Sequence, residues 1–115
     1  MFGHAKSKAT RKAQRFFSER RVRVHFVDLR RRGIAPGELR RFVQRFDVGG
    51  VVDPASRSYE RQGLAYLSAS ADDWIDRIVA DPTLLRLPLV RRGRDLCVGD
   101  DPSAWERLAR AARDG

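Results

Sequence analysis

Apolar residues recur three or four positions apart along four stretches of the chain, which predicts four amphipathic helices. These helices are predicted to begin at Ser7, Pro36, Ser70 and Pro102, with Ser70 and Asp101 as the N-caps of the last two, and a shorter one is expected over 57–64. Ser7 suits the N-cap of the first helix, which extends to about Arg20, because a serine hydroxyl can accept an amide proton from the first turn. The pair Gly49-Gly50 is expected to stop the second helix, and Asp81-Pro82 the third.

Other stretches alternate or run apolar over shorter lengths, which predicts strands. They are a stub at 1–3, the β-branched run 22–29, and two arms of a hairpin at 84–90 and 96–98. A strand, a helix and a second strand in sequence imply a parallel pair with a right-handed crossover, and the hairpin adds antiparallel strands. The expected fold is therefore α/β and thioredoxin-like. It has a mixed four-stranded sheet with flanking helices and a helical insertion between the β-α-β half and the C-terminal hairpin and helix.

Length and composition are those of one globular domain over residues 1–115. The chain is 42% hydrophobic and has no apolar run long enough for a membrane span, so we expect a cytoplasmic protein without a membrane partner. The net charge is +9, with 21 arginines against three lysines. Clustered cations favour a polyanion such as a nucleic acid, but these arginines are spread over the whole chain. We therefore interpret the arginines as a general use of arginine in place of lysine, and not as evidence of a nucleic-acid site.

Cysteine and histidine are too few for a metal or disulfide framework. The single cysteine, Cys97, lies in the apolar run Leu96-Cys97-Val98, where a buried and inert thiol is typical. We therefore expect no metal and no cofactor.

The start of the first predicted helix carries the strongest candidate chemistry. The loop from Gly3 leads to Ser7 and to a first turn that includes Lys8, Arg11 and Lys12. Backbone amides at a helix N-terminus, supported by cations, favour an anion. Ser7 is the residue that this loop would present to such a ligand.

Several motifs occur in the order found in a known family. They are Phe2-Gly3 through Ser7, Thr10–Ala13, Phe16-Phe17, Val27–Leu29, Pro36–Leu39, Gly63-Leu64, Pro82–Pro88 and Val98-Gly99. In these motifs the chain resembles the arsenate reductase (ArsC)/Spx family over nearly its whole length. The resemblance implies a thioredoxin-like fold and, in active members, a cysteine thiolate at the start of the first helix. That thiolate attacks arsenate or cycles with a disulfide, while arginines hold the oxyanion; Spx-type relatives regulate transcription by contacting RNA polymerase.

The sequence departs from that family pattern at two positions. Ser7 stands where the resemblance places the nucleophilic cysteine. In the reductases an arginine directly precedes the hairpin proline, which is usually cis; here Leu87 precedes Pro88, and Arg86 lies one residue earlier. By resemblance, the anion-binding set is Ser7, Lys8, Arg11 and Arg86, and Pro88 is the active-site proline.

A serine in this loop changes the chemistry that can be expected. Oxygen cannot enter thiol–disulfide exchange, and His4 is the only nearby base that could activate Ser7 for a hydrolase reaction. The first hypothesis is therefore a redox-inactive family member that binds a protein or an anionic partner. The alternatives are an active, glutaredoxin-linked arsenate reductase-type oxidoreductase with Cys97 as its thiol, and a charge-driven nucleic-acid binder.

Overall fold

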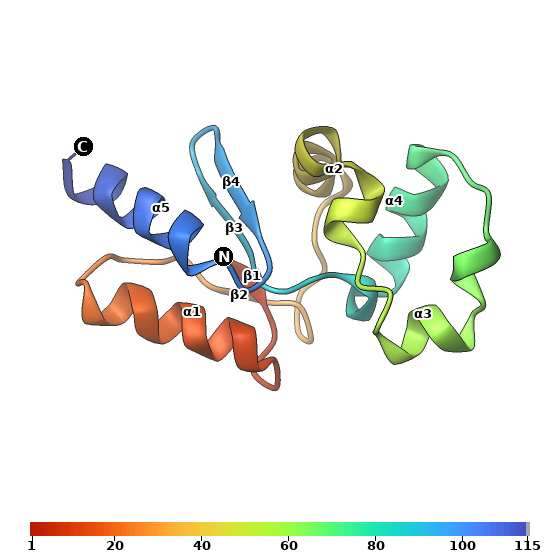
Figure 1. The fold of residues 1–115 in the computed structure, drawn as a ribbon, viewed down its shortest axis with the longest axis horizontal. Helices are drawn as coiled ribbons and strands as arrows, with labels where there is room; N and C mark the ends of the chain where they lie inside the picture. The colour runs from red at the N-terminus through yellow and green to blue at the C-terminus, as the bar shows by residue number, and fades with distance from the viewer. Residues whose placement is uncertain (115) are drawn as a thin grey trace. The chain divides into compact units, whose positions relative to one another are not determined.

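The computed structural model describes residues 1–114, and its four strands form one sheet (Figure 1). The strands are β1 (Phe2–Gly3), β2 (Val27–Asp28), β3 (Leu89–Arg92) and β4 (Asp95–Val98). Their order is β2-β1-β3-β4, with β1 parallel to β2 and antiparallel to β3. The predicted mixed four-stranded sheet with flanking helices is confirmed. The chain divides into a first unit, Met1–Arg32 with Leu87–Gly115, and a second unit, Gly33–Arg86.

The first unit contains the whole sheet and two helices, α1 (Lys8–Glu19) and α5 (Pro102–Asp114). Its core is built around the fully buried Trp105, with Phe17 from α1 and Cys97 from β4. An ion pair of 3.1 Å between Arg20 and Glu106 joins the two helices, and this hydrogen bond is the main reason why the pKa of Glu106 lies below its usual value. The last helix begins as predicted, because the Asp101 carboxylate accepts the Ala104 amide at 3.1 Å.

The second unit is the helical insertion that the sequence predicts between the second and third strands. Its elements are α2 (Pro36–Val51), α3 (Arg57–Arg61), the 3-10 helix η1 (Leu64–Tyr66), α4 (Ala71–Ala80) and the 3-10 helix η2 (Pro82–Leu84). The predicted N-cap of α4 is confirmed, since Ser70 Oγ accepts the Asp73 amide at 3.1 Å. Buried residues of α2 and α4, among them Leu39 and Ile75, form its core.

The prediction that Gly49-Gly50 stops the second helix is wrong. Helix α2 continues to Val51, and its interruption lies at Asp47, whose backbone is non-helical (φ 63°, ψ 169°). A Cβ at Gly50 would lie 2.8 Å from Cβ of Phe46. Gly50 therefore makes room for the Phe46 side chain inside the helical stretch.

The first arm of the hairpin is shorter than the predicted run 84–90. Leu84 ends η2, where Asp81 accepts the Thr83 amide, and Leu85 forms only an isolated antiparallel bridge with Val52. The strand itself begins at Leu89 and pairs with β4 as far as Arg92. An apolar run can supply core contacts from a 3-10 turn as well as from a strand, which is why periodicity alone overextends the arm.

The predicted strand over 22–29 is paired only at Val27–Asp28. On the neighbouring β1, pairing ends at Met1, whose ammonium donates to the His25 carbonyl at 2.9 Å and whose carbonyl accepts the Val27 amide at 2.8 Å. Residues 22–26 form no named helix or strand. Among residues 1–114, no helix is both long and apolar enough to cross a membrane.

Candidate functional site

The start of α1 is organised by Ser7, as the sequence predicts. The Ser7 amide donates to the His4 carbonyl at 2.9 Å, which closes a turn, and its Oγ accepts the Thr10 amide at 3.1 Å. By helix geometry, the amides of Lys8 and Ala9 have no acceptor within the helix, so they remain directed along the axis at this end. Ser7 is therefore an N-cap at a helix terminus that favours negative charge.

Gly3 and Thr10 hold the loop close to the helix. Thr10 is fully buried, and its Oγ1 lies 3.4 Å from the His4 amide that donates to it. A Cβ on Gly3 would lie 2.5 Å from Thr10 Cγ2, so only glycine allows the strand to approach the helix this closely. The turn at residues 4–7 is thus fixed by contacts on both sides.

The cations of the first helix turns differ in what they contact. Arg11 Nη1 donates to the Ala5 carbonyl at 3.0 Å, so this guanidinium lies along the loop, and Lys12 pairs with Asp100 at 3.0 Å. Lys8 is exposed and makes no ion pair with another described residue. The loop therefore offers Lys8 and the remaining donors of Arg11 to an anion.

The hairpin residues of the predicted site belong to different units. Pro88 lies in the first unit, follows a cis peptide bond from Leu87, and directly precedes Leu89, the partner of Phe2. That register places Pro88 beside the end of β1 from which the Ser7 loop departs. Arg86 lies in the second unit, where its Nε donates to the Val52 carbonyl at 2.9 Å.

Neither His4 nor Cys97 is arranged for catalysis with Ser7. His4 Nδ1 accepts the Lys6 amide at 3.0 Å, and no side-chain hydrogen bond joins His4 to Ser7 within residues 1–114. Cys97 is 2% exposed, and burial, together with the charge of Asp101, raises the pKa of its thiol to about 12. No cluster of three or more His, Cys, Asp or Glu side chains suited to a metal occurs in that part of the chain.

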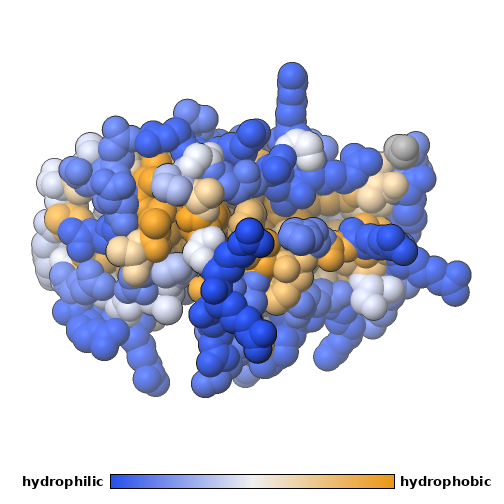
Figure 2. All heavy atoms as spheres, turned by 180° about the vertical axis from the view of Figure 1, so that it is seen from behind, coloured by the Kyte–Doolittle hydropathy of each residue, from blue (hydrophilic) through white to orange (hydrophobic). Residues whose placement is uncertain are grey.

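Charge is divided unevenly between the two units, contrary to the even spread that the sequence suggests. The first unit has 17 Lys and Arg against seven Asp and Glu, a net charge of +10, whereas the second has seven against eight, a net charge of −1. On the face shown in Figure 2, hydrophilic side chains cover most of the surface and apolar patches lie between them. The excess of positive charge thus belongs to the unit that carries the sheet and the Ser7 loop.

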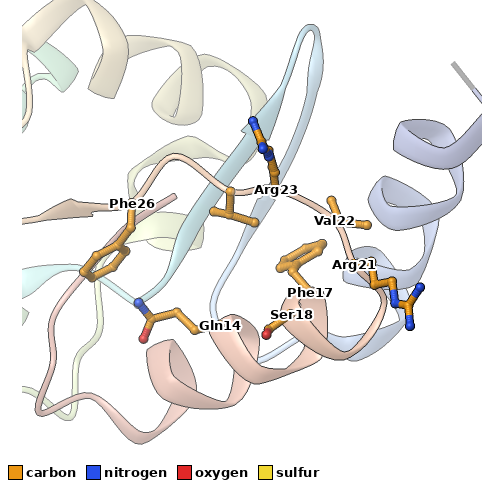
Figure 3. Close-up of a pocket in the computed structure, with 8 residues that line it drawn as sticks. Gln14, Phe17, Ser18, Arg21, Val22, Arg23 and Phe26 are labelled. Carbon is orange, nitrogen blue, oxygen red and sulfur yellow. The ribbon is translucent and has the colours of Figure 1, made fainter.

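The first unit also contains hollows that the sequence analysis did not predict. One of about 400 Å³ lies between α1 and the segment 21–26, and in Figure 3 Phe17 points from α1 toward that segment while Arg23 points away from the helix. A second hollow of about 190 Å³ lies between the same segment and β3 and α5. The sequence pattern carries no signal for them, because alternation over 22–29 predicts a paired strand there.

Comparison with known proteins shows the family and the fold of this chain. A family model described as the ArsC family matches residues 2–108, whereas a comparison with curated proteins finds no match. The structure is similar to that of the protein titled YffB (TM-score 0.84, 21% identity, 92% of this chain and 94% of that one). It is also similar to an arsenate reductase from Vibrio cholerae (TM-score 0.82, 15% identity, 93% of each chain).

A further similar structure is that of a putative ArsC family related protein from Bacteroides fragilis, with a TM-score of 0.85, 18% identity and coverage of 93% of each chain. At these identities the structural likeness establishes the fold, and it confirms the thioredoxin-like α/β prediction. The family model establishes kinship, because it spans nearly all of the sequence. The chain belongs to the ArsC family.

Proposed function

We propose that this protein is a redox-inactive member of the ArsC family that acts by binding a partner. The observation that carries the proposal is that the family's nucleophile position and the single cysteine of this chain are different residues. Position 7, at the start of α1, holds a serine whose hydroxyl caps the helix, and the only thiol, that of Cys97, is buried in the core. The arsenate reductase-like fold is thus present without a thiolate at the helix terminus.

A serine in this place cannot substitute for the missing thiolate. Its hydroxyl needs an adjacent base to ionise, and the nearest histidine, His4, already accepts a backbone amide through Nδ1. Even an activated oxygen could not attack and leave sulfur in a disulfide exchange. A reduction through Cys97 would require a thiolate from a group whose pKa is raised to about 12.

The partner that we propose is an oxyanion or a protein with an acidic surface. The amides at the start of α1, together with Lys8 and Arg11, favour a small anion. The +10 charge of the first unit favours a larger acidic partner through long-range attraction. A protein partner, of the kind that Spx-type relatives contact, fits this charge. A chain with a single cysteine is consistent with the cytoplasm.

The test is an arsenate reduction assay with glutathione and glutaredoxin, on the wild type and on Ser7→Cys. We expect no turnover by the wild type, because it has no accessible thiolate. Turnover by Ser7→Cys would mean that the rest of the family site is intact, since a cysteine at a helix N-terminus with nearby cations has a lowered pKa. Cys97→Ala is the matched control and is expected to behave as the wild type.

Two outcomes would overturn the proposal. Wild-type turnover that disappears in Cys97→Ala would make Cys97 the thiol of an active reductase. Wild-type turnover that persists in Cys97→Ala and disappears in Ser7→Ala would make Ser7 itself a nucleophile. Titration calorimetry with inorganic arsenate and sulfate then measures the binding function, with Lys8→Gln expected to weaken affinity and Lys12→Gln, whose amine already pairs with Asp100, expected to change it less.

A further inference from the structure

The second unit contains a hollow of about 260 Å³, which we call the insertion pocket. It lies between the end of α2, α3, η1 and the first turn of α4, the three α-helices being labelled in Figure 1. Every residue that lines it belongs to the second unit, so the pocket is complete within that unit. The residues that give it its chemistry are Val48, Val52, Tyr59, Leu64, Trp74 and Arg86.

The walls of the insertion pocket are apolar, and several of them are firmly packed. Val52 and Leu64 are each 3% exposed, and Trp74 is 8% exposed. Val48 and Tyr59 are half-buried. Walls of this kind, with a few polar groups among them, are typical of sites that bind the apolar body of a small molecule.

Arg86 is the only charged residue among those that line the pocket, and the protein holds it at two points. Its backbone amide donates to the Val51 carbonyl at 2.8 Å, and its Nε donates to the Val52 carbonyl at 2.9 Å. The preceding residue, Leu85, forms the antiparallel bridge with Val52. Because the guanidinium is already held in place, it loses little conformational freedom when a ligand binds.

Three lining side chains have hydrogen-bond donors that are not used within residues 1–114. They are the two Nη groups of Arg86, the hydroxyl of Tyr59 and Nε1 of Trp74. The Trp74 side chain is more than nine-tenths buried, yet the only fully enclosed side-chain polar atom without a partner in this part of the chain is Nε1 of Trp105. The Trp74 N–H is therefore accessible, and the unused donors favour a ligand that supplies acceptor oxygens.

The charge and shape of these groups favour a carboxylate over a phosphate. The two Nη groups of an arginine form a planar pair of donors that matches the two oxygens of a carboxylate. A phosphate group carries up to two negative charges, whereas Arg86 supplies a single positive charge and no other lining residue adds to it. The volume of about 260 Å³ lies below the range of ordinary ligand pockets, about 300–1,000 Å³, and suits a body of one ring.

We propose that the insertion pocket binds a small monocarboxylic acid with a single aromatic ring or a branched aliphatic body. The carboxylate pairs with the Nη groups of Arg86, and the apolar body lies against Val52, Leu64 and Trp74. The guanidinium selects the charge of the ligand, and the apolar walls select its body.

This inference does not depend on the proposed function, because Ser7, Lys8 and Arg11 belong to the first unit. Lys8→Gln should weaken sulfate binding and leave binding of the carboxylic acid unchanged. Failure of one proposal is therefore distinguishable from failure of the other.

The test is an NMR titration of the purified chain with 3-phenylpropionate, followed through the two indole N–H resonances. We expect the Trp74 resonance to shift saturably, whereas that of Trp105, which is fully buried in the core of the first unit, should not move. Acetate, which lacks the apolar body, and 3-phenylpropionamide, which lacks the charge, should each bind about tenfold more weakly or worse.

Variants of Arg86 test the charge of the site. Arg86→Gln should weaken binding of 3-phenylpropionate about tenfold or more. Arg57→Gln, at an exposed position of α3 that does not line the pocket, is the matched control and should change it less than about twofold. Arg86→Glu should bind 3-phenylpropylamine in place of the acid, with the same shift of the Trp74 resonance.

Four results would overturn the proposal. They are equal binding of 3-phenylpropionate and its amide, equal shifts of the Trp74 and Trp105 resonances, full affinity in a folded Arg86→Gln variant, and tighter binding of phenyl phosphate than of the acid. The first, second and fourth use the wild type, so they decide the question even if a variant fails to fold.

Discussion

The two ends of β1 differ in how their polar groups are satisfied. At the end that leads into α1, the Ser7 hydroxyl, the Thr10 hydroxyl and the His4 carbonyl each accept a backbone amide from within residues 4–10. At the other end, Arg23 and His25 present backbone groups that have no partner among the described residues. A strand of two residues thus separates a closed end from an open one.

The two ends are ordered by different kinds of contact. The closed end is built from side chains within eight residues of one another, so its geometry is encoded locally. The open end depends on pairing between strands far apart in the chain, β1 with β2 and with β3. Substitutions at the closed end should therefore change the free energy of unfolding more than those at the open end.

The largest expected effect concerns Cys97, a buried residue in the core of the first unit. Cys97 pairs with Val90, and its pKa is raised from 9.0 to about 12 mainly by burial. The Cys97 thiol therefore ionises at a lower pH in the unfolded chain than in the folded protein. Its contribution to the free energy of unfolding is fully present below pH 9 and is lost as the pH rises toward 12. The loss is about 1.4 kcal/mol per pH unit, or about 3 kcal/mol at pH 11.

Urea unfolding between pH 8 and 11 measures this effect as the difference in slope between the wild type and Cys97→Ala. The alanine variant should be less stable at pH 8 because it leaves a cavity, but its stability should fall less with pH. Equal slopes would mean that the Cys97 thiol ionises at the same pH in the folded protein as in the unfolded chain.

The second effect tests the closed end through Gly3. Gly3→Ala should cost about 1–3 kcal/mol of unfolding free energy, because the new methyl would lie 2.5 Å from Thr10 Cγ2. Gly33→Ala is the control, since a Cβ at this position would have nothing within 4 Å, and its effect on the free energy of unfolding should be close to zero. Thr10→Ala should recover part of the loss when combined with Gly3→Ala; purely additive costs would show that the two residues do not compete for space.

The features that the sequence predicted correctly are those encoded by local contacts. Ser7, Ser70 and Asp101 were identified as caps because each needs only an amide three residues ahead, and each accepts that amide in the structure. The order of helices and strands was likewise predictable from periodicity.

Features that depend on neighbours distant in sequence were predicted incorrectly or missed. Gly50 was interpreted as a stop signal, although its role is to accommodate Phe46. The alternation over 22–29 predicts a strand, but only Val27 and Asp28 of that run pair with β1. The cations are spread along the whole sequence but not evenly in the fold, because the first unit has 17 Lys and Arg and the second has seven, while the acidic residues divide almost equally, seven and eight.

The third effect tests whether Ser7 acts as a cap. Ser7→Ala should lower the unfolding free energy by about 1 kcal/mol, since the Thr10 amide loses its acceptor, while Ser7→Asp should retain most of the stability. Ser18→Ala, on the exposed surface of α1, is the matched control and should be neutral or slightly stabilising. If Ser7→Ala were as stable as the wild type, the helix start would be held by Gly3 and Thr10 alone.

The smallest expected effect is at the open end. Arg23→Ala should change the unfolding free energy by less than about 0.5 kcal/mol, because its side chain is exposed and makes no ion pair with another described residue. The amides of Arg23 and His25 should exchange with solvent at least tenfold faster than that of Val27, which donates to the Met1 carbonyl at 2.8 Å. Slow exchange at Arg23 and His25 in the monomer would mean that the edge is already paired. The two ends of β1 would then differ only in their side chains, because the backbone N–H and C=O groups at both ends would have hydrogen-bond partners.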